Sequence, residues 1–290
     1  MIKEQVVIST PDAGPNQVQV DYWNATAGEV WARFQDQLDR QLAPLGLEAM
    51  QALSATAGEQ LIDVGCGCGH TTLELAGRVG PGGAVLGVDI SHPMLEVARR
   101  RAAVTPELTA RFREADVQAA DLGGSVFDAA FSRFGVMFFS DPVAAFANLQ
   151  RSLKPGGRLA FVCWRSFAEN PWMGAPLAAA LPFIPPPPPM DPLAPGPFAF
   201  ADADRVRAIL TGAGFTAIDI RPHDTQIGSG DVEQTLQLAF RVGPLGAVLR
   251  EDPSRAGVIA DAVRRVLETH LTPDGVLMPA AVWIVTARRA

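Results

Sequence analysis

Residues 61–76 read Leu-Ile-Asp-Val-Gly-Cys-Gly-Cys-Gly-His-Thr-Thr-Leu-Glu-Leu-Ala. The apolar residues up to Val64 predict a short buried strand, and the segment from His70 onward predicts a helix. Three glycines lie in the turn between these two elements. Because glycine has no Cβ, such a turn lets the backbone approach a ligand closely. The stretch therefore predicts a strand, a turn and a helix, with a ligand-binding site at the turn.

The spacing of these glycines distinguishes between two kinds of nucleotide. Gly65, Gly67 and Gly69 do not match the dinucleotide pattern G-x-G-x-x-G, because His70 occupies the last position that needs a glycine. Asp63, which lies just before the first glycine, would repel a pyrophosphate but would attract an ammonium group. The methionine end of S-adenosylmethionine carries such a group. The turn therefore predicts S-adenosylmethionine as the ligand and disfavours a dinucleotide.

An acidic residue ends the next predicted strand. Residues 84–89 read Ala-Val-Leu-Gly-Val-Asp, and Asp89 comes 24 residues after Gly65. A carboxylate at the tip of a second parallel strand can accept hydrogen bonds from both hydroxyls of a ribose. The alternative is that Asp89 caps the following helix, since Ser91-His92-Pro93-Met94 is typical of a helix start. With the glycine turn upstream, we expect the ribose-binding role.

Strands and helices alternate between residues 60 and 164. The strands are expected at 60–64, 84–89, near 109–114, 126–132 and 158–164, and the helices at 70–79, 93–103 and 141–153. This alternation is typical of parallel strands joined by right-handed crossovers, in which ligands bind at the carboxyl ends of the strands. Gly65, Asp89, Asp116 and Ser132 all follow predicted strand ends. We therefore expect these four residues to meet at one crevice.

The remaining segments predict a cap and two insertions. Residues 20–53 show apolar and aromatic residues at helical spacing. Residues 171–197 hold 11 of the 24 prolines, including Pro185–Pro189, and predict an irregular segment that is either a stiff surface loop or part of a lid. Further elements are expected at 202–213 (helix), 216–222 (strand), 231–250 and 254–270 (helices) and 281–287 (strand). The predicted segments are a helical cap at 1–56, a ligand-binding core at 57–166, a proline-rich insertion at 167–201, and the last strands at 202–290 with a helical lid insertion at 225–279.

Composition indicates a folded protein of the cytoplasm. Hydrophobic residues make up 48% and charged residues 19% of the 290 positions, which is typical of a globular core. The net charge of −7 argues against a nucleic-acid partner. No apolar run reaches the roughly 18 residues of a membrane span, and the N-terminus lacks a signal-peptide pattern. We therefore expect a cytoplasmic protein without stable membrane insertion, and a homodimer remains open.

The three cysteines predict neither a disulfide framework nor a metal site. Cys66 and Cys68 lie in the glycine turn, where a bridge between residues two positions apart would be strained. A metal site would need a second pair of ligands at a spacing that this chain lacks. Cys163 lies in a predicted strand and suits a small buried hydrophobic position.

Several segments together resemble the class I S-adenosylmethionine-dependent methyltransferases. They are Asp63 to Gly69, Val88-Asp89-Ile90-Ser91, Ala115-Asp116-Val117, Phe131 to Phe139, and Lys154-Pro155-Gly156-Gly157-Arg158-Leu159. Within the class, the chain is similar to the branch related to ubiquinone and menaquinone biosynthesis methyltransferases and to many small-molecule methyltransferases. The resemblance covers residues 58–165 strongly and 200–290 weakly. It implies a Rossmann-like α/β fold whose seven-stranded sheet has the order 3-2-1-4-5-7-6, with strand 7 antiparallel.

The resemblance also implies which residues bind the cofactor. Gly65, Cys66 and Gly67, with Gly69 in the same turn, would contact its methionine and ribose parts, and Asp63 would position the methionine amine. The adenosine part would be held by Asp89 at the ribose hydroxyls, Ile90 and Met94 against the adenine, Asp116 at the adenine amine, and Ala115 and Val117 beside it. For Asp116, the alternative is a loop acid or a helix cap.

The same resemblance also implies which residues border the methyl acceptor. Ser132 would border the cofactor at the methyl-transfer end of the crevice. Arg133, Phe134 and Met137 would lie toward the acceptor. Arg133 would either bind an anionic group of the acceptor or pair with a surface acid, and the sequence does not choose between these roles.

In this branch, N-terminal helices usually cover the cofactor. Tyr22 is a candidate for contact with the cofactor, and Trp23 and Trp31 are candidates for contact with the acceptor, because aromatic faces suit a sulfonium cation and a planar ring. The alternative is ordinary core packing, which is the more frequent reason for aromatic residues at helical spacing.

The predicted chemistry is a direct displacement on the methyl group of the cofactor. Alignment and desolvation can supply much of the acceleration, so no protein nucleophile is required. A general base matters only where the acceptor must lose a proton. We assign no catalytic residue, because His70 and His92 lie near the cofactor end. His223 ends a predicted strand and, of the four histidines, best suits contact with the acceptor, but an exposed loop position fits it better.

Missing motifs narrow the choice of acceptor. Enzymes that methylate amines of nucleic-acid bases or of glutamine usually carry an Asn/Asp/Ser-Pro-Pro-Tyr/Phe motif, and this chain has Ser132-Arg133-Phe134-Gly135 in its place. Cytosine-C5 methyltransferases use a Pro-Cys nucleophile, and this chain has no Pro-Cys dipeptide. We therefore expect a small, partly apolar acceptor. The alternatives are a protein or RNA methyltransferase, which needs an open surface for a large acceptor, and a non-catalytic module that binds S-adenosylmethionine.

Overall fold

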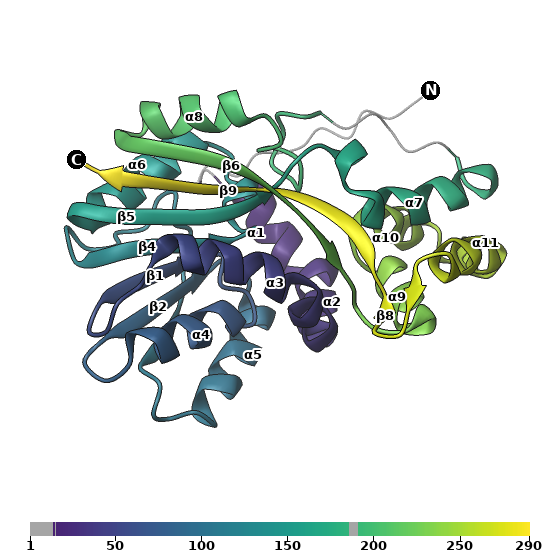
Figure 1. Cartoon of the computed structure of the whole chain (residues 1–290), viewed down its shortest axis with the longest axis horizontal. Coiled ribbons are helices and arrows are strands. Elements are labelled where there is room, and N and C mark those ends of the chain that lie inside the picture. The colour runs from purple at the N-terminus through teal and green to yellow at the C-terminus, as the bar shows by residue number, and fades with distance from the viewer. Residues whose placement is uncertain (1–13, 15, 186–190) are drawn as a thin grey trace.

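One mixed sheet of seven strands organises the chain (Figure 1). The computed structural model describes residue 14 and residues 16–185 and 191–290. The strands of the sheet, in spatial order, are β3 (Ala110–Glu114), β2 (Ala84–Asp89), β1 (Gln60–Val64), β4 (Phe127–Arg133), β5 (Leu153–Trp164), β9 (Met278–Arg289) and β6 (Phe215–Ile227). Because β9 is antiparallel to both β5 and β6, the expected order 3-2-1-4-5-7-6 with an antiparallel seventh strand is confirmed. A separate small hairpin pairs β7 (Leu271–Thr272) with β8 (Gly275–Val276).

The centre of the sheet consists of β1 and β4, which are largely buried on both faces. Leu61 and Ile62 of β1 have no exposed area, as expected for parallel strands covered on both sides. Asp63 lies beside Gly87 of β2 and Phe131 of β4 in the strand register. The carboxyl ends of these three strands therefore lie together, with the glycine turn among them.

Helices cover both faces of the sheet and its carboxyl edge. They are α1 (Gln17–Asn24), α2 (Thr26–Arg33), α3 (Gln35–Leu53), α4 (His70–Val79), α5 (His92–Ala103), α6 (Pro142–Ser152), α7 (Pro171–Ala180), α8 (Ala203–Gly212), α9 (Val232–Ala239), α10 (Gly243–Glu251) and α11 (Ala256–Glu268), with 3₁₀ helices at Val136–Phe138, Phe167–Glu169, Leu181–Phe183 and Pro253–Arg255. In Figure 1, α3 and α4 lie in front of the sheet and α6 lies behind it. Within the described ranges, no helix combines the length and the apolar character that a membrane crossing requires.

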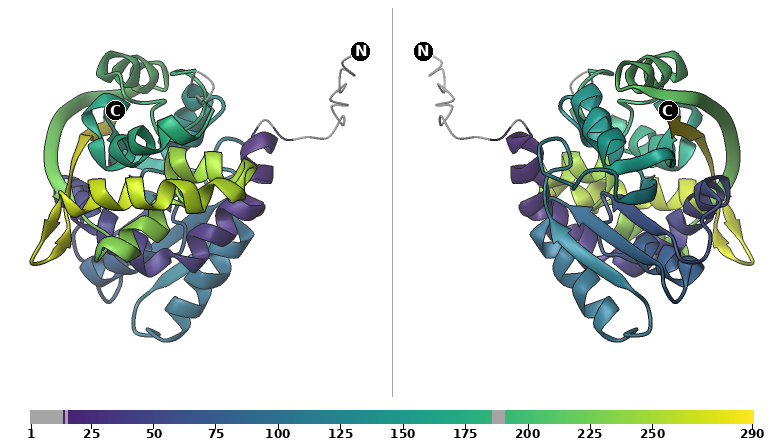
Figure 2. Two further views of the ribbon diagram at one scale, coloured as in Figure 1. Left: turned by 90° about the vertical axis from the view of Figure 1, so that its right-hand side faces the viewer. Right: turned by 90° about the vertical axis from the view of Figure 1, so that its left-hand side faces the viewer.

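Two groups of helices border a cavity at the carboxyl ends of the central strands. We call α1, α2 and α3 the cap helices, and α7 with α9, α10 and α11 the lid helices. Figure 2 shows the yellow-green helices α9, α10 and α11 of the lid beside the purple helices α1 and α2 of the cap. The lid helices bury a hydrophobic cluster of their own, which includes Leu177, Leu236, Leu245, Ile259, Val263 and Leu267. The lid is therefore a packed unit with its own small core.

Two expectations about helices are wrong. The single helix expected at 231–250 is divided into α9 and α10, because Gly243 adopts a φ of +77° and Pro244 has no N–H to continue a helical ladder. The proline-rich segment, expected to be irregular, begins with α7. Pro171 starts that helix, where the missing N–H would have no partner anyway. In the run Pro185–Pro189, the residues after the first lie outside the described part of the chain.

Other elements differ from expectation mainly at their ends. The helical span at 20–53 is interrupted at Ala25, whose backbone is extended, and again at Phe34. The turn expected at Lys154 to Gly157 belongs to β5. The strand expected near 216–222 continues to Ile227, because β6 stays paired with β9 as far as Met278.

Candidate functional site

A cavity of about 500 Å³ lies where the carboxyl ends of the central strands meet the cap and lid helices. The core contributes Val64, Gly65, Cys66, Gly67, Cys68, Thr71, Val88, Asp89, Ile90, Met94, Ala115, Asp116, Val117, Arg133, Phe134, Gly135, Met137, Phe138, Phe139 and Trp164 to its wall. The remaining wall consists of Asn16, Gln19, Tyr22, Trp23, Trp31, Gln35, Leu38, Asp39, Leu42, Trp172, Met173, Pro195, Gly196, Pro197, Phe198, Val242, Gly243, Pro244, Ala247 and Arg250. Of the residues that the sequence singled out, Asp63, Gly69 and Ser132 are absent from this wall.

The glycine turn after β1 brings bare backbone to the cavity. Gly65, Gly67 and Gly69 have φ values of +68°, +52° and +81°, a region that side chains disfavour. A Cβ on Gly65 would lie 2.6 Å from the Cα of Gly135. A Cβ on Gly69 would meet Ala98 of α5 and Phe112 of β3 instead, so this third glycine allows α5 and β3 to pack closely against the turn.

Asp89 holds the glycine turn from the tip of β2. Its Oδ2 accepts a hydrogen bond from the Gly67 N–H at 2.7 Å, and its Oδ1 accepts one from the Ser91 N–H at 2.8 Å. The residue at the N-cap of α5 is Ser91 and not Asp89. Burial raises the pKa of the Asp89 carboxyl above its usual range, while these backbone donors oppose the shift. The Asp89 carboxylate therefore lies on the cavity wall, and backbone N–H groups hold both of its oxygens in place.

Asp63 is buried directly behind the turn. Its Oδ2 accepts hydrogen bonds from the hydroxyls of Thr71 and Thr72 at 2.6 and 2.7 Å. Its Oδ1 is buried and has no hydrogen-bond partner among the described residues. Burial raises the pKa of Asp63 to about 6, and the two threonine hydroxyls act in the opposite direction. The Oδ1 of Asp63 can therefore still accept a hydrogen bond.

Ser132 and Asp116 have local backbone partners. The Ser132 hydroxyl donates to the Val64 carbonyl at 2.7 Å and so ties β4 to the start of the turn. Asp116 lies on the wall, where its Oδ1 accepts a hydrogen bond from the Gln118 N–H at 2.9 Å. Ser132 therefore positions the backbone that faces the cavity, and Asp116 both orders its own loop and borders the cavity.

A charged cluster forms another part of the wall, and sequence reasoning did not identify its central member, Asp39. Asp39 of α3 accepts hydrogen bonds from Arg133 at 3.0 Å and from Arg101 of α5 at 2.8 Å. Arg133 also lies 3.3 Å from Nδ1 of His70. In the sequence, Asp39 is only an acidic residue that lies among the regularly spaced apolar residues of the helix expected at 20–53. Of the two roles expected for Arg133, pairing with an acid is the one observed, although that acid is buried.

Aromatic rings line the rest of the cavity. Trp23 makes edge-on contacts with Tyr22, Trp31 and Phe138, at centroid distances of 5.2, 5.7 and 5.1 Å. Tyr22 keeps 44% of its surface exposed, whereas Trp23 keeps 9%. The aromatic residues of the cap helices therefore serve in core packing and also face the cavity.

A second aromatic group lies toward the lid. Phe134 and Trp164 are stacked at 4.1 Å, and Trp164 contacts Trp172 of α7 at 5.0 Å. Phe134 has a φ of +64°, which is rare for a bulky residue and common at functional sites. The sequence did not identify Trp164 or Trp172, because their proximity depends on how α7 packs against the end of β5.

The four histidines lie outside the cavity wall. His70 borders the charged cluster, and His92 is exposed and pairs with Glu114 at 2.9 Å. His223 lies in β6, paired in register with Val282 of β9. The structure therefore adds no histidine as a candidate for acid–base chemistry.

The model of a methyltransferase domain matches residues 62–161, which run from β1 to β5. These residues contain the glycine turn and the tips of β2 and β4, and the sheet has the order and the antiparallel last strand of that fold. Residues 62–161 form a methyltransferase domain, and the chain has the fold of the class I S-adenosylmethionine-dependent methyltransferases.

Individual methyltransferases show how far this similarity extends. The chain is 29% identical over 220 residues to the O-methyltransferase cnsE of Penicillium expansum, covering 76% of this chain and 72% of that protein. It is 41% identical over 103 residues to the demethylmenaquinone methyltransferase of Thermus thermophilus, covering 36% and 46%. The solved structure of the YcgJ protein from Bacillus subtilis superimposes with a TM-score of 0.54 at 18% identity, covering 85% and 98%, and supports the fold alone. The chain spans between 31% and 72% of the length of the first curated relatives that it matches.

Proposed function

We propose that this chain transfers a methyl group from S-adenosylmethionine to a small, partly apolar acceptor by direct displacement. The observation that carries the proposal is the division of one cavity into two ends. One end presents the glycine turn and Asp89, with Trp23 of the cap packed against Met94 and Ile90, and the other is lined by Phe134, Trp164 and Trp172. A cofactor at the first end would direct its methyl group toward an acceptor at the second.

The residues at the first end fit the cofactor. The Oδ1 of Asp63 lacks a partner among the described residues, and the ammonium of the methionine part would pair with it directly or through a water molecule. Gly65, Cys66 and Gly67 would contact the methionine and ribose through backbone groups, and Asp89 would accept from the ribose hydroxyls. The adenine would lie among Ile90, Met94, Ala115, Asp116 and Val117. Gly69 and Ser132 would support this site from behind the wall.

The bound cofactor supplies an activated methyl group, so the chain itself has to align the acceptor and exclude water. Phe134, Met137 and Trp172 would hold a planar acceptor against the core and lid. Tyr22 and Trp23 would cover the cofactor from the cap. Because no histidine lies on the described wall, we assign no general base.

The position of the cavity favours a small acceptor over a protein or an RNA. Cap and lid helices both contribute to its wall, and concave sites of this kind suit small molecules. The names of two relatives, an O-methyltransferase and a demethylmenaquinone methyltransferase, agree with this proposal. Arg250 and Arg133 also line the wall and would tolerate a negatively polarised acceptor.

Calorimetric titration with S-adenosylmethionine, S-adenosylhomocysteine and NADH tests the cofactor. We expect both sulfur nucleotides to bind and NADH not to bind. A folded, ligand-free preparation that binds neither sulfur nucleotide would overturn the proposal. Incubation with S-adenosylmethionine and a panel of phenols, amines and quinols, followed by mass spectrometry, then tests transfer. Cofactor binding without transfer to any member would favour a non-catalytic binding module.

A further inference from the structure

The turn that follows β2 contacts both the proposed cofactor site and the cap. Asp89, at the tip of β2, lies on the wall of the large cavity, and its Oδ1 accepts a hydrogen bond from the Ser91 N–H at 2.8 Å. Ile90, between these two residues, also lines the cavity. Residues 90–92 are hydrogen-bonded to the last two residues of the cap helix α1. The position of the cap is therefore tied to residues beside the proposed ribose site.

Ser91 links the cap to Asp89. It is buried at the N-cap position of α5, where a serine side chain usually accepts a hydrogen bond from the helix. Its hydroxyl makes no such bond to the described N–H groups of α5 and donates instead to the carbonyl oxygen of Trp23 at 2.7 Å. The Ser91 side chain thus holds the cap, while its backbone N–H holds Asp89.

Asn24 makes the other two hydrogen bonds between the cap and this turn. Its Nδ2 donates to the Ile90 carbonyl at 2.7 Å, and its Oδ1 accepts from the His92 N–H at 2.7 Å. His92 is the first residue of α5, and the N–H groups of a first helical turn have no partner within their helix. Asn24 therefore caps α5 from a different helix. We call the three hydrogen bonds made by Asn24 and the Ser91 hydroxyl the cap latch.

Gly28 of α2 allows the cap to pack this closely on the turn. A Cβ at this position would lie 2.6 Å from Oγ of Ser91 and 3.0 Å from Cγ of Pro93. Glycine destabilises the interior of a helix, and the close contact with Ser91 explains why a glycine is present here. A larger side chain would push α2 away from the turn.

Trp23 forms part of the cavity wall next to the residues expected around the adenine. It packs with Ala27 and Met94 in a small buried cluster, and Ile90 lies against this cluster. Trp23, Ile90 and Met94 all line the large cavity. Movement of the end of α1 away from the turn would therefore open the wall at this point.

We propose that Asn24 and Ser91 are positioning residues that hold α1 closed over the adenosine part of the cofactor, an inference that rests on the proposed function. Neither residue is part of the described cavity wall, so both act through Trp23 and the turn. The three hydrogen bonds of the cap latch must break before the end of α1 can leave the turn. Since a ligand leaves faster when its cover is open more often, the cap latch should slow release of the cofactor.

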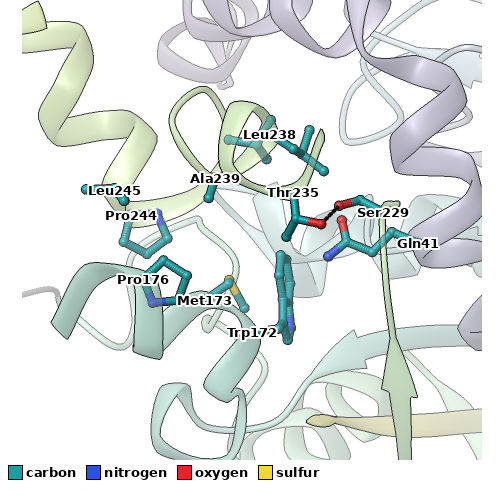
Figure 3. A pocket seen from close by; sticks show the side chains of 11 residues that line it. Gln41, Trp172, Met173, Pro176, Ser229, Thr235, Leu238, Ala239, Pro244 and Leu245 are labelled. Carbon is teal, nitrogen blue, oxygen red and sulfur yellow. Dashed lines mark hydrogen bonds between the residues drawn. The ribbon is translucent and has the colours of Figure 1, made fainter. Parts of the chain in front are cut away.

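A buried serine of the lid provides a matched control. A second, small cavity of about 30 Å³ lies between α3 and the lid helices, and its lining includes Gln41, Trp172 and Ser229 (Figure 3). Ser229 is buried like Ser91, and its hydroxyl donates to the hydroxyl of Thr235 at 3.1 Å, as Figure 3 shows. Ser229→Ala therefore removes a buried serine hydroxyl without changing a hydrogen bond of the cap latch.

The rate at which S-adenosylhomocysteine is released tests the cap latch. Radiolabelled S-adenosylhomocysteine bound to the protein is displaced by an excess of the unlabelled compound. We expect Asn24→Ala and Ser91→Ala each to speed release about fivefold, and the double variant about 20-fold, because the cap latch loses hydrogen bonds in each. Ser229→Ala should leave the rate unchanged, as should Gln17→Ala, which removes an amide that donates to Asp21 within α1.

Hydrogen exchange followed by mass spectrometry locates the effect in the chain. Bound S-adenosylhomocysteine should slow exchange of the amides of α1 (Gln17–Asn24) in the unmodified protein, and this slowing should be about fivefold weaker in Asn24→Ala and Ser91→Ala. Exchange in β4 (Phe127–Arg133) should be the same in all three proteins. A general loss of stability would instead raise exchange in both elements.

The outcomes separate the cap latch from the proposed function. If Asn24→Ala and Ser91→Ala release S-adenosylhomocysteine at the rate of Ser229→Ala, the cap latch is overturned. It is also overturned if both variants lose thermal stability while release and α1 exchange stay unchanged, because the two residues would then support the fold alone. Absence of S-adenosylhomocysteine binding to the unmodified protein would overturn the proposed function itself.

Discussion

Asp39 accepts a hydrogen bond from Arg133 at 3.0 Å, although 94 residues separate them in the chain. The side chains of both residues are 12% exposed. The pair joins the cap helix α3 to the end of β4, and Arg101 adds α5 through the other carboxylate oxygen of Asp39. The buried carboxylate of Asp39 therefore links α3, β4 and α5 beside the cavity.

Replacing this carboxylate is expected to destabilise the protein. Asp39→Asn leaves two arginines without their counter-charge, and the free energy of unfolding should fall by about 2–3 kcal/mol. Urea denaturation followed by circular dichroism measures the change. Asp36→Asn, at an exposed position of the same helix, is the control and should change the value by less than about 0.5 kcal/mol. Equal effects of the two variants would show that the pair is not stabilising.

Asp89→Asn is expected to weaken binding of S-adenosylhomocysteine by about ten- to hundredfold. The carboxylate both faces the proposed ribose site and holds the N–H of Gly67, and loss of charged hydrogen bonds costs about 1.5–3 kcal/mol. Calorimetric titration gives the dissociation constant, with Glu96→Gln, an exposed residue of α5, as the control. An unchanged dissociation constant in the folded variant would contradict the ribose assignment.

The raised pKa of Asp63 predicts a specific dependence of stability on pH. An acid whose pKa is about 6 in the folded chain and 3.8 otherwise binds its proton more tightly when folded. The free energy of unfolding should therefore fall as pH rises through this window, by about 3 kcal/mol from this group. Asp63→Asn should remove that part of the slope in denaturation at a series of pH values. Parallel profiles for the two proteins would contradict the shift.

Cofactor binding should have the opposite dependence on pH. The ammonium of S-adenosylhomocysteine favours an ionised Asp63, so we expect its affinity to rise about tenfold between pH 5 and pH 7. The pKa of Asp89 is also raised by burial, and comparison with Asp63→Asn separates the two contributions. If the variant keeps the full rise in affinity, the ammonium does not contact Asp63.

Tyr22→Ala tests the contribution of the cap. Tyr22 lines the cavity while 44% of its surface is exposed, so its removal should weaken cofactor binding or slow transfer by about tenfold with little loss of stability. Val18→Ala, on the same helix at 78% exposure, is the control. If the two variants behave alike in both assays, Tyr22 contributes only to packing against Trp23.

The pattern of residues 60–164 determined the core of this protein. The alternation of strands and helices, the glycines at 65, 67 and 69, and the acid at Asp89 act through local backbone geometry and through neighbouring strand tips. Parallel strands of a sheet bring their carboxyl ends together, so residues that follow such strands were expected to meet. The match of this segment to a methyltransferase domain agrees with that expectation.

Tertiary structure alone decided what surrounds this core. Asp39 meets Arg133 because α3 packs across β4 and β5, and Gln41 comes near Trp172 because α3 and the lid helices border the same small cavity. Helical periodicity gives the apolar face of each helix but not which helix covers it, so these contacts have no local signature. Residue spacing therefore defined the cofactor end of the cavity, and long-range packing of cap and lid formed its acceptor end.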